Sequence, residues 1–239
     1  MTHVVAIVPA KDRVDLVAAT VSALLDTGEV GEVLVVDDGS VDGTGESASK
    51  AGARVIALKS NIGKGGAVAA GVAASGAPDT YLLIDADLGD SAASASDLLT
   101  PVAEGAADMV IGILPETNRS QGFGIAKRSA ALLLEEATGQ KFVEPLSGQR
   151  AIRGPLLRSL TLAPRFGLEL GLTIDVHVEG GRIQEVPTQF IHVPSKRTPK
   201  GFAHRGAQMI DLMQASASRL GWRCTLGVTT RSLVRRSRQ

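Results

Sequence analysis

The chain has 239 residues, of which 44% are hydrophobic and 21% charged, and its 25 basic side chains balance 25 acidic ones. This composition is that of an ordinary globular protein and argues against both an intrinsically disordered chain and a general nucleic-acid binder. The single cysteine, Cys224, rules out an intramolecular disulfide and a multi-cysteine zinc site. The sequence has neither a signal-peptide pattern nor an apolar run of about 18 residues, so we expect a cytoplasmic protein.

Short apolar runs alternate with helical patterns through the first 115 residues. Four runs predict strands, at Val4–Val8, Val33–Val36, Arg54–Leu58 and Tyr81–Ile84. Between them, helices are predicted over Leu16–Leu25, with Asp15 as an early cap, over a polar segment ending at Lys50, and over Gly63–Ala74. This alternation predicts an α/β fold with a mostly parallel sheet and right-handed crossovers. The first half is therefore Rossmann-like, an arrangement typical of nucleotide-binding proteins.

The pattern changes after a further apolar run at Met109–Ile113. Helical patterns follow over Ala126–Thr138, Phe166–Ile174 and Ala203–Leu220, and Glu185–Phe190 alternates like a strand with one exposed face. No linker separates this half as an independent domain. The last residues are basic, with Arg223, Arg231, Arg235, Arg236 and Arg238 and no acidic residue after Asp211. We interpret this end as solvated; the alternative is attachment to an anionic membrane surface.

Polar motifs follow four of the predicted strands. They are Pro9-Ala10-Lys11-Asp12, Asp37-Asp38-Gly39-Ser40, Asn61-Ile62-Gly63-Lys64-Gly65-Gly66 and Asp85-Ala86-Asp87. In a parallel α/β sheet, ligands bind beyond the carboxyl ends of the strands. We therefore expect the four motifs to contribute to one binding site.

The aspartates of the fourth motif are candidate metal ligands. Asp85 and Asp87 come directly after the apolar run Tyr81–Ile84, and both can approach one hard cation. Mg²⁺ and Mn²⁺ prefer oxygen ligands and share their coordination with phosphate. An isolated Asp-x-Asp also fits a turn or a helix cap. Its place at the end of a buried strand favours the metal site.

The second and third motifs suit a nucleotide. Asp37 and Asp38 stand where a carboxylate accepts hydrogen bonds from a nucleobase or a ribose, and Gly39 permits the turn. The third motif opens a predicted helix, so its backbone N–H groups and Lys64 suit a phosphate. Its spacing is not that of a Walker loop. Close helix packing explains Gly65 and its neighbouring glycine equally well.

Taken together, the four motifs resemble the family 2 glycosyltransferases and their relatives of GT-A fold. The closest segments are Val35-Val36-Asp37-Asp38-Gly39-Ser40-Val41-Asp42-Gly43-Thr44 and Leu83-Ile84-Asp85-Ala86-Asp87. The resemblance implies one GT-A domain over residues 1–222, with a nucleotide-sugar-binding half (1–115) and an acceptor half (116–222), followed by a basic tail (223–239). In that family the motifs after the first two strands hold base and ribose, and Asp-x-Asp binds the metal that bridges the diphosphate.

The resemblance and the motifs together define a candidate donor site. Its residues are Pro9, Ala10, Lys11, Asp12, Asp37, Asp38, Gly39, Lys64, Asp85 and Ala86, with Mg²⁺ or Mn²⁺ held by Asp87 and Asp85. One departure is visible, because the relatives usually have Asn-Glu where this chain has Lys11-Asp12. That departure leaves base contact by Asp12 open.

The second half resembles the glucosyl-3-phosphoglycerate synthases, which transfer glucose with retention of configuration. Phe166–Asp175 is similar to their Gly-Tyr-Gly-Val-Glu-Ile-Gly-Leu-Leu-Ile-Asp segment, whose Glu lies near the reacting sugar. This makes Glu169 the catalytic candidate and Asp175 the alternative, and helical geometry places the two on different faces. The resemblance also implies a histidine as third metal ligand, for which His192 fits best and His204 is the alternative.

Acceptor residues are expected in two segments. The Arg-Val-Thr acceptor loop of those synthases has no match in Gln121-Gly122-Phe123-Gly124, so the same acceptor is not expected to be bound in the same way. A second resemblance, to the polyprenyl-phosphate sugar synthases, relates their Ser-Gly-Phe-Arg to Ser147-Gly148-Gln149-Arg150. It implies that Gln149 and Arg150 face the acceptor or its phosphate, and the alternative for Arg150 is a surface ion pair. The acceptor candidates are Gly122, Gly124, Ser147, Gly148, Gln149 and Arg150.

These observations predict a metal-dependent glycosyltransferase that moves a hexose from a UDP- or GDP-sugar to a small phosphorylated or hydroxylated acceptor. The segment around Glu169 favours retention. The alternatives are an inverting polyprenyl-phosphate sugar synthase, a sugar nucleotidyltransferase and, from another class, a non-catalytic sugar-nucleotide-binding module. Expected partners are the nucleotide sugar and its acceptor and no nucleic acid. A homodimer and peripheral attachment at the inner membrane face stay open.

Overall fold

The computed structural model describes residues 2–115, 124–191, 200–222 and 224–228. Within these residues one mixed sheet has the strand order β3-β2-β1-β4-β6-β5-β7. The strands are β1 (Val4–Ala10), β2 (Glu32–Asp37), β3 (Arg54–Ala57), β4 (Thr80–Leu83), β5 (Met109–Ile113), β6 (Arg150–Arg153) and β7 (Ile183–Pro187). Every neighbouring pair is parallel except the two that involve β6, which runs antiparallel to β4 and β5. The predicted α/β fold with a mostly parallel sheet is confirmed.

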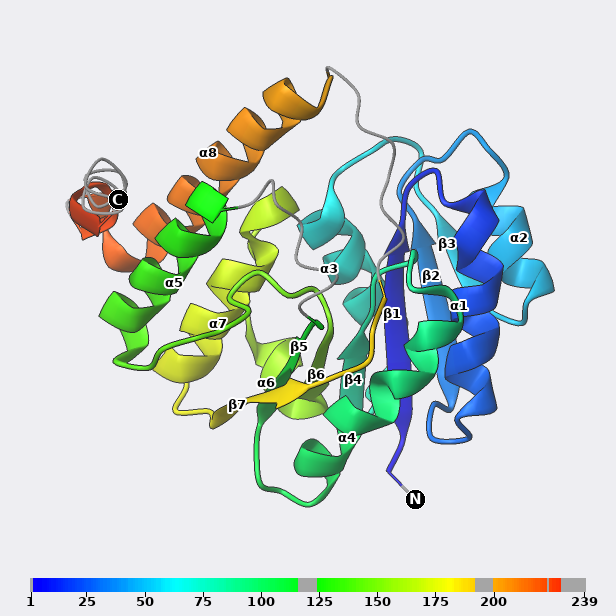
Figure 1. Cartoon of the computed structure of the whole chain (residues 1–239). Coiled ribbons are helices and arrows are strands. Elements are labelled where there is room, and N and C mark those ends of the chain that lie inside the picture. Colours follow the sequence, from blue (N-terminus) through cyan, green and yellow to red (C-terminus); the bar gives the residue numbers. More distant parts are fainter. Residues whose placement is uncertain (1, 116–123, 192–199, 223, 229–239) are drawn as a thin grey trace.

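Helices cover both faces of the sheet (Figure 1). The helical elements are α1 (Val14–Asp26), α2 (Thr44–Lys50), α3 (Lys64–Ala74), η1 (Gly89–Ala95), α4 (Ser96–Ala103), α5 (Gly124–Thr138), α6 (Gly154–Ser159), η3 (Arg165–Gly167), α7 (Leu168–Val178) and α8 (Lys200–Leu220). Residues of α1, α2, η1 and α4 share one apolar cluster with the strands, and residues of α3, α5, α6, α7 and α8 share the other. Alternate residues of β1 supply both, because successive side chains of a strand point to opposite faces.

The edge of the sheet that bears the site is formed by the carboxyl ends of β1, β2, β3 and β4. Leu83, the last residue of β4, pairs with Arg150, the first residue of β6. The antiparallel strand therefore begins at the edge where the parallel strands end. This direction brings the segment before β6 next to the Asp85 loop, although the two are 64 residues apart in sequence.

Most predicted elements are present. Three differences between the prediction and the structure are informative. β6 was not predicted, because its four residues, which run directly into α6, carry no periodic signal. β7 ends at Pro187 and not at Phe190, whose ring is nonetheless fully buried. In the expected tail, Thr225 is buried and shares a hydrogen bond of 2.9 Å with Ser216 of α8. The folded part of the chain thus extends past residue 223. No helix in the described ranges has the length and apolar character needed to span a bilayer.

Candidate active site

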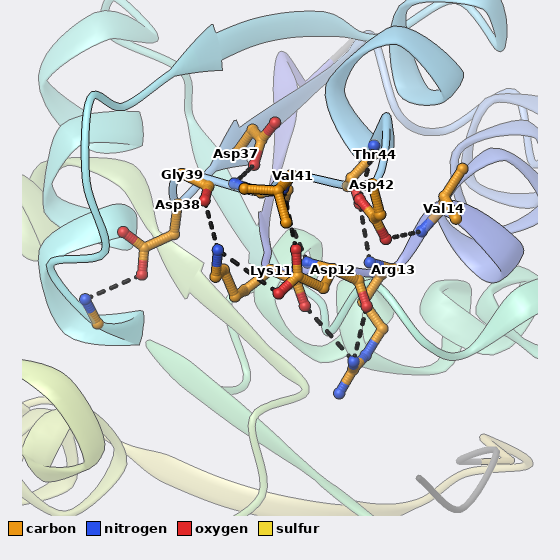
Figure 2. Close-up of polar contacts among 12 residues, drawn as sticks. Lys11, Asp12, Arg13, Val14, Asp37, Asp38, Gly39, Val41, Asp42 and Thr44 are labelled. Atoms are coloured by element: carbon orange, nitrogen blue, oxygen red, sulfur yellow. Dashed lines mark hydrogen bonds and ion pairs between the residues drawn. The ribbon is translucent and has the colours of Figure 1, made fainter. Parts of the chain in front are cut away.

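The loops after β1 and β2 are joined to each other (Figure 2). The Lys11 ammonium donates to the carbonyl oxygen of Gly39, and the backbone N–H of Asp12 donates to Ser40 Oγ at 2.9 Å. In return, Asp12 Oδ1 accepts from the backbone N–H of Val41 at 3.1 Å. Asp12 has φ +50°, a left-handed conformation that Asp tolerates better than most residues. The Lys11-Asp12 pair therefore fixes the relative position of the two loops.

The second loop also caps the first helix. Asp42 Oδ2 accepts from the backbone N–H of Val14 at 3.2 Å, and Thr44 Oγ1 accepts from that of Arg13 at 2.8 Å. These bonds satisfy N–H groups that a helix start leaves without partners. The expected cap was Asp15, which lies instead inside the first turn. A residue distant in sequence thus performs the capping.

Asp37, the last residue of β2, and Asp38, which follows it, are buried and accept backbone N–H groups. Asp37 Oδ1 accepts from Ser40 at 2.8 Å, which closes the turn. Asp38 accepts with both oxygens, from Ile62 at 2.7 Å and from Gly63 at 2.9 Å. Asp38 thereby ties the end of β2 to the residues that precede α3. Gly63 has φ +84°, which glycine adopts without a steric penalty.

Lys64, the first residue of α3, lies between two carboxylates. Its Nζ is 2.6 Å from Asp85 Oδ1 and 2.8 Å from Glu169 Oε1. Gln149 Nε2 donates to the second Asp85 oxygen at 2.9 Å. Burial alone would lower the pKa of Lys64, but the charges of Asp85 and Glu169 outweigh it and hold that pKa above its usual value. We call Lys64, Asp85 and Glu169 the Lys64 cluster.

Gly148, the residue before Gln149, packs so closely on the Lys64 cluster that it leaves no free space for a side chain. A Cβ on Gly148 would lie 2.7 Å from Asp85 Oδ2 and would overlap Lys64 Nζ as well. Gln149 is fully buried, and its Oε1 accepts from the backbone N–H of Asp85 at 3.2 Å. The segment predicted to contact the acceptor therefore positions the aspartate of the fourth motif.

Arg150 is only 1% exposed, so the alternative of a surface ion pair is wrong. Its guanidinium donates to the carbonyl oxygens of Ser147 (2.9 Å) and Pro145 (3.3 Å) and to Thr173 Oγ1 of α7 (2.9 Å). Burial lowers the pKa of Arg150 to about 10, against the opposing effect of Glu169 and Glu185, so it stays charged at neutral pH. It joins the segment before β6 to the helix that carries Glu169.

The loop after β4 is held by α1. Thr20 donates to the carbonyl oxygen of Ala86 at 3.1 Å and accepts from the backbone N–H of Gly89 at 2.9 Å. Asp87 Oδ2 lies 3.6 Å from Arg13 Nε, and both side chains are partly exposed. A small hollow opens beside the loop, lined among others by Pro9, Lys64, Gly148, Arg150, Glu169 and Leu172.

Helix α7 separates the two catalytic candidates, as its predicted geometry requires. Glu169, 6% exposed, lies in the Lys64 cluster, and the hydroxyl of Thr173 donates to its carbonyl oxygen one turn later. Asp175 lies elsewhere on the helix, where Arg219 of α8 donates to it at 2.7 Å. Glu169 therefore lies with the other predicted site residues, and Asp175 does not.

Some predicted residues lie outside the part of the chain that the structure describes. Gly122 and His192 belong to undescribed segments. Gly124 is the first residue of α5, and His204 lies in α8, where its side chain is not described. The described residues contain no group of three or more His, Cys, Asp and Glu side chains suited to a metal. Asp85 and Asp87 nevertheless supply carboxylate oxygens, and Mg²⁺ is commonly held by one or two carboxylates together with substrate phosphates. The donor set fits such a cation.

Three partner side chains were not predicted, of which Arg13 and Thr173 lie at the site and Arg219 does not. Arg13 pairs with Asp87, Thr173 accepts from Arg150, and Arg219 pairs with Asp175. The spacing of Glu169 and Thr173 by one helical turn was the available signal for the second of these. The other two pairs join segments that no local pattern relates.

Comparison with known proteins agrees with this arrangement. The model of glycosyl transferase family 2 matches residues 5–151. Glycosyltransferase AglJ of Haloferax volcanii is 33% identical over 195 residues, which are 78% of this chain and 62% of that protein. Glucosyl-3-phosphoglycerate synthase of Mycobacterium tuberculosis is 30% identical over 185 residues, 68% of this chain and 56% of that enzyme. The chain therefore spans less than two thirds of the length of these two relatives.

A third relative and two solved structures match more completely. Undecaprenyl-phosphate mannosyltransferase of Micrococcus luteus is 28% identical over 205 residues, 79% of this chain and 84% of that enzyme. The crystal structure of the M. tuberculosis synthase with phosphoglyceric acid has a TM-score of 0.79 at 26% identity, covering 92% of this chain and 80% of that one. The same enzyme with Mn²⁺, UDP-glucose and phosphoglyceric acid has a TM-score of 0.78 at 25% identity and the same coverage. With a family match over more than half of its length and the GT-A fold of these structures, the chain belongs to glycosyl transferase family 2.

Proposed function

We propose that this chain is a glycosyltransferase that moves a hexose from a UDP- or GDP-linked sugar to a small phosphorylated or hydroxylated acceptor, with Mg²⁺ or Mn²⁺ as cofactor. The observation that carries the proposal is the Lys64 cluster, in which one lysine meets carboxylates from β4 and α7 at the carboxyl edge of the sheet. The solved relative that binds Mn²⁺, UDP-glucose and phosphoglyceric acid supports the same ligand classes. The family assignment supports a glycosyltransferase over a nucleotidyltransferase and a non-catalytic binding module.

The donor's diphosphate would bind next to Lys64 and the Asp85-Ala86-Asp87 loop. A bound divalent cation would supply charge neutralisation for the departing nucleoside diphosphate. In this proposal Asp87 and Asp85 hold that cation, and His192 is kept as a third ligand. Lys64, positively charged and held by two carboxylates, would stabilise the charge that grows on the leaving group.

Glu169 would act on the sugar. A base for an inverting reaction must approach the acceptor on the face of the sugar opposite the diphosphate. Glu169 shares Lys64 with Asp85, so it lies on the side where the diphosphate would bind. This placement supports a retaining reaction, in which Glu169 stabilises positive charge on the sugar as the bond to the diphosphate breaks.

A polyprenyl-phosphate acceptor is the second candidate. It is favoured by the match to undecaprenyl-phosphate mannosyltransferase, which the chain covers over 84% of its length. In that case the transfer would be inverting, and Asp85 and Lys64 would keep their roles toward the donor. The two candidates therefore differ in acceptor and stereochemistry and not in the donor site.

A thermal-shift panel tests the donor site first. UDP and GDP, each with and without Mn²⁺, are added to the purified chain at about 100 times the dissociation constant. A ligand specific for the folded state then stabilises by roughly 2.7 kcal/mol, which is several degrees for a chain of this size. We expect a Mn²⁺-dependent shift with one of the two nucleotides. Transfer from the matching sugar nucleotide to 3-phosphoglycerate or to a short polyprenyl phosphate then separates the acceptors, and no shift with either nucleotide contradicts the proposal.

A further inference from the structure

Arg165, at the start of η3, has a backbone conformation that is unusual for its residue type. Its φ is +52°, in the left-handed region that costs free energy for any residue with a Cβ. Its side chain is exposed, and the structure gives its guanidinium no hydrogen-bond or ion-pair partner among the described residues. A glycine would adopt this backbone conformation without the free-energy cost. The requirements of folding therefore do not explain why an arginine stands at this position.

The residues around Arg165 pack directly on the segment that carries Lys64. A Cβ on Gly63 would lie 2.8 Å from Arg165 Cγ and 3.1 Å from its Cα. A Cβ on Gly65 would lie 2.9 Å from the backbone nitrogen of Arg165, and it would also overlap the carbonyl oxygen of Ala163. Both glycines flank Lys64 in the sequence. The start of η3 is therefore fixed against the residues on either side of the cluster's lysine.

The other cations at this edge of the sheet already have partners. Lys64 is shared by Asp85 and Glu169, and Arg150 is buried and donates to carbonyl and hydroxyl oxygens. Arg13 lies beside Asp87. Among the described residues at the cluster, Arg165 is the cation whose hydrogen-bond donors are unused. A guanidinium presents paired N–H groups that match the oxygens of a phosphate.

We propose that Arg165 binds the diphosphate of the donor, as a further binding residue of the site. The inference rests on the proposed function. Glycine suits the left-handed backbone, so this chain accepts a less favourable conformation and places a cation next to Gly63.

Two substitutions and one matched control test this role. Arg165→Gly removes the cation and relaxes the backbone, and Arg165→Lys keeps the charge without the paired donors. Lys141→Gln removes a positive charge from a side chain that is 84% exposed. Lys141 follows Gln140, whose side-chain amide donates to the carbonyl oxygen of Ile183 at the start of β7, at the opposite edge of the sheet. Binding of UDP and of GDP, each with Mn²⁺, is measured by calorimetry, and the melting temperature is measured without ligand.

We expect Arg165→Gly to weaken binding of the nucleoside diphosphate by about tenfold or more, with Arg165→Lys between it and the wild type. The ligand-free melting temperature of Arg165→Gly should equal or exceed that of the wild type, whereas a merely structural arginine would lower it on removal. Lys141→Gln should bind as the wild type does.

Three results would overturn the inference. The first is diphosphate affinity of Arg165→Gly within about twofold of the wild type. The second is an equal loss in Lys141→Gln. The third is unchanged diphosphate binding with a raised KM for a phosphorylated acceptor, which would assign the arginine to the acceptor. If the wild type itself binds neither UDP nor GDP, the proposed function fails and this inference fails with it.

Discussion

Gly148→Ala perturbs the Lys64 cluster without removing any functional group. The added methyl would lie 2.7 Å from Asp85 Oδ2, well inside the 3.4 Å at which ordinary van der Waals contact begins, and it would overlap Lys64 Nζ. Lys64 cannot move away without lengthening its contacts of 2.6 Å and 2.8 Å to the two carboxylates. The Lys64 ammonium and the Asp85 carboxylate must therefore move from their present positions by roughly 1 Å. A displacement of this size costs about 100-fold in rate in an enzyme site.

The expected loss of stability is moderate. Inserting a methyl group into a packed site costs about 1–3 kcal/mol, and a weakened charge-assisted hydrogen bond costs a similar amount. For a chain of this length we expect the melting temperature to fall by roughly 2–4 °C per kcal/mol. Turnover of the sugar nucleotide should fall by about 100-fold at a temperature where the variant is still fully folded.

Gly112→Ala is the matched control. The new methyl would be 3.3–3.4 Å from its nearest neighbours, which are Thr188, Gln149 and Leu98 side-chain carbons, and none belongs to the Lys64 cluster. Both variants add one methyl group at a glycine near the same edge of the sheet. We expect the control to retain turnover within a few-fold. Wild-type turnover in Gly148→Ala, or an equal loss in both variants, would show that turnover does not depend on the geometry of the Lys64 cluster.

Three further predictions concern single carboxylates. Asp87→Ala should abolish Mn²⁺-dependent turnover and leave the melting temperature nearly unchanged, because a partly exposed side chain is removed; unchanged dependence of turnover on Mn²⁺ would contradict its role as ligand. Glu169→Gln keeps the shape of the side chain, so turnover should fall by a large factor with donor KM little changed, and equal losses in both would argue against a catalytic role. The pKa of Asp108 is lowered by the backbone N–H of Arg182 and by the charges of Arg182 and Arg153, so its stabilisation is present above the unfolded value near 3.9 and is lost as pH falls through the folded value. Asp108→Asn should therefore cost about 1 kcal/mol at pH 7 and converge with the wild type as the pH falls below the folded pKa of Asp108 in urea titrations, while a constant difference over that range would disprove the coupling.

The parallel half of the fold was predictable because each strand and helix carries its own local pattern. Buried runs such as Val33–Val36 and Tyr81–Ile84 end in polar motifs, and a parallel sheet places such ends on one edge. Helical periodicity likewise predicted that Glu169 and Asp175 lie on different faces of one helix. These inferences needed only short-range information.

Contacts between distant segments could not be predicted in the same way. The antiparallel β6 has four residues, and its pairing with β4 and β5 depends on the whole sheet. The sequence left base contact by Asp12 open, and it did not show that this carboxylate accepts from Val41 of the second loop. Arg150 looked equally suited to a surface, because a sequence does not show which carbonyl oxygens will surround a guanidinium.

In the proposed function, the Lys64 cluster binds the donor's diphosphate in a metal-dependent transfer. This role is tested most directly by the release of nucleoside diphosphate from UDP-glucose and from a GDP-hexose, with Mn²⁺ or with EDTA, by the wild type and by Lys64→Met. The wild type should release UDP or GDP only with the metal, and Lys64→Met, verified as folded by its melting curve, should lose at least about 100-fold of this activity. Equal release in EDTA, or wild-type release by folded Lys64→Met, would contradict this role.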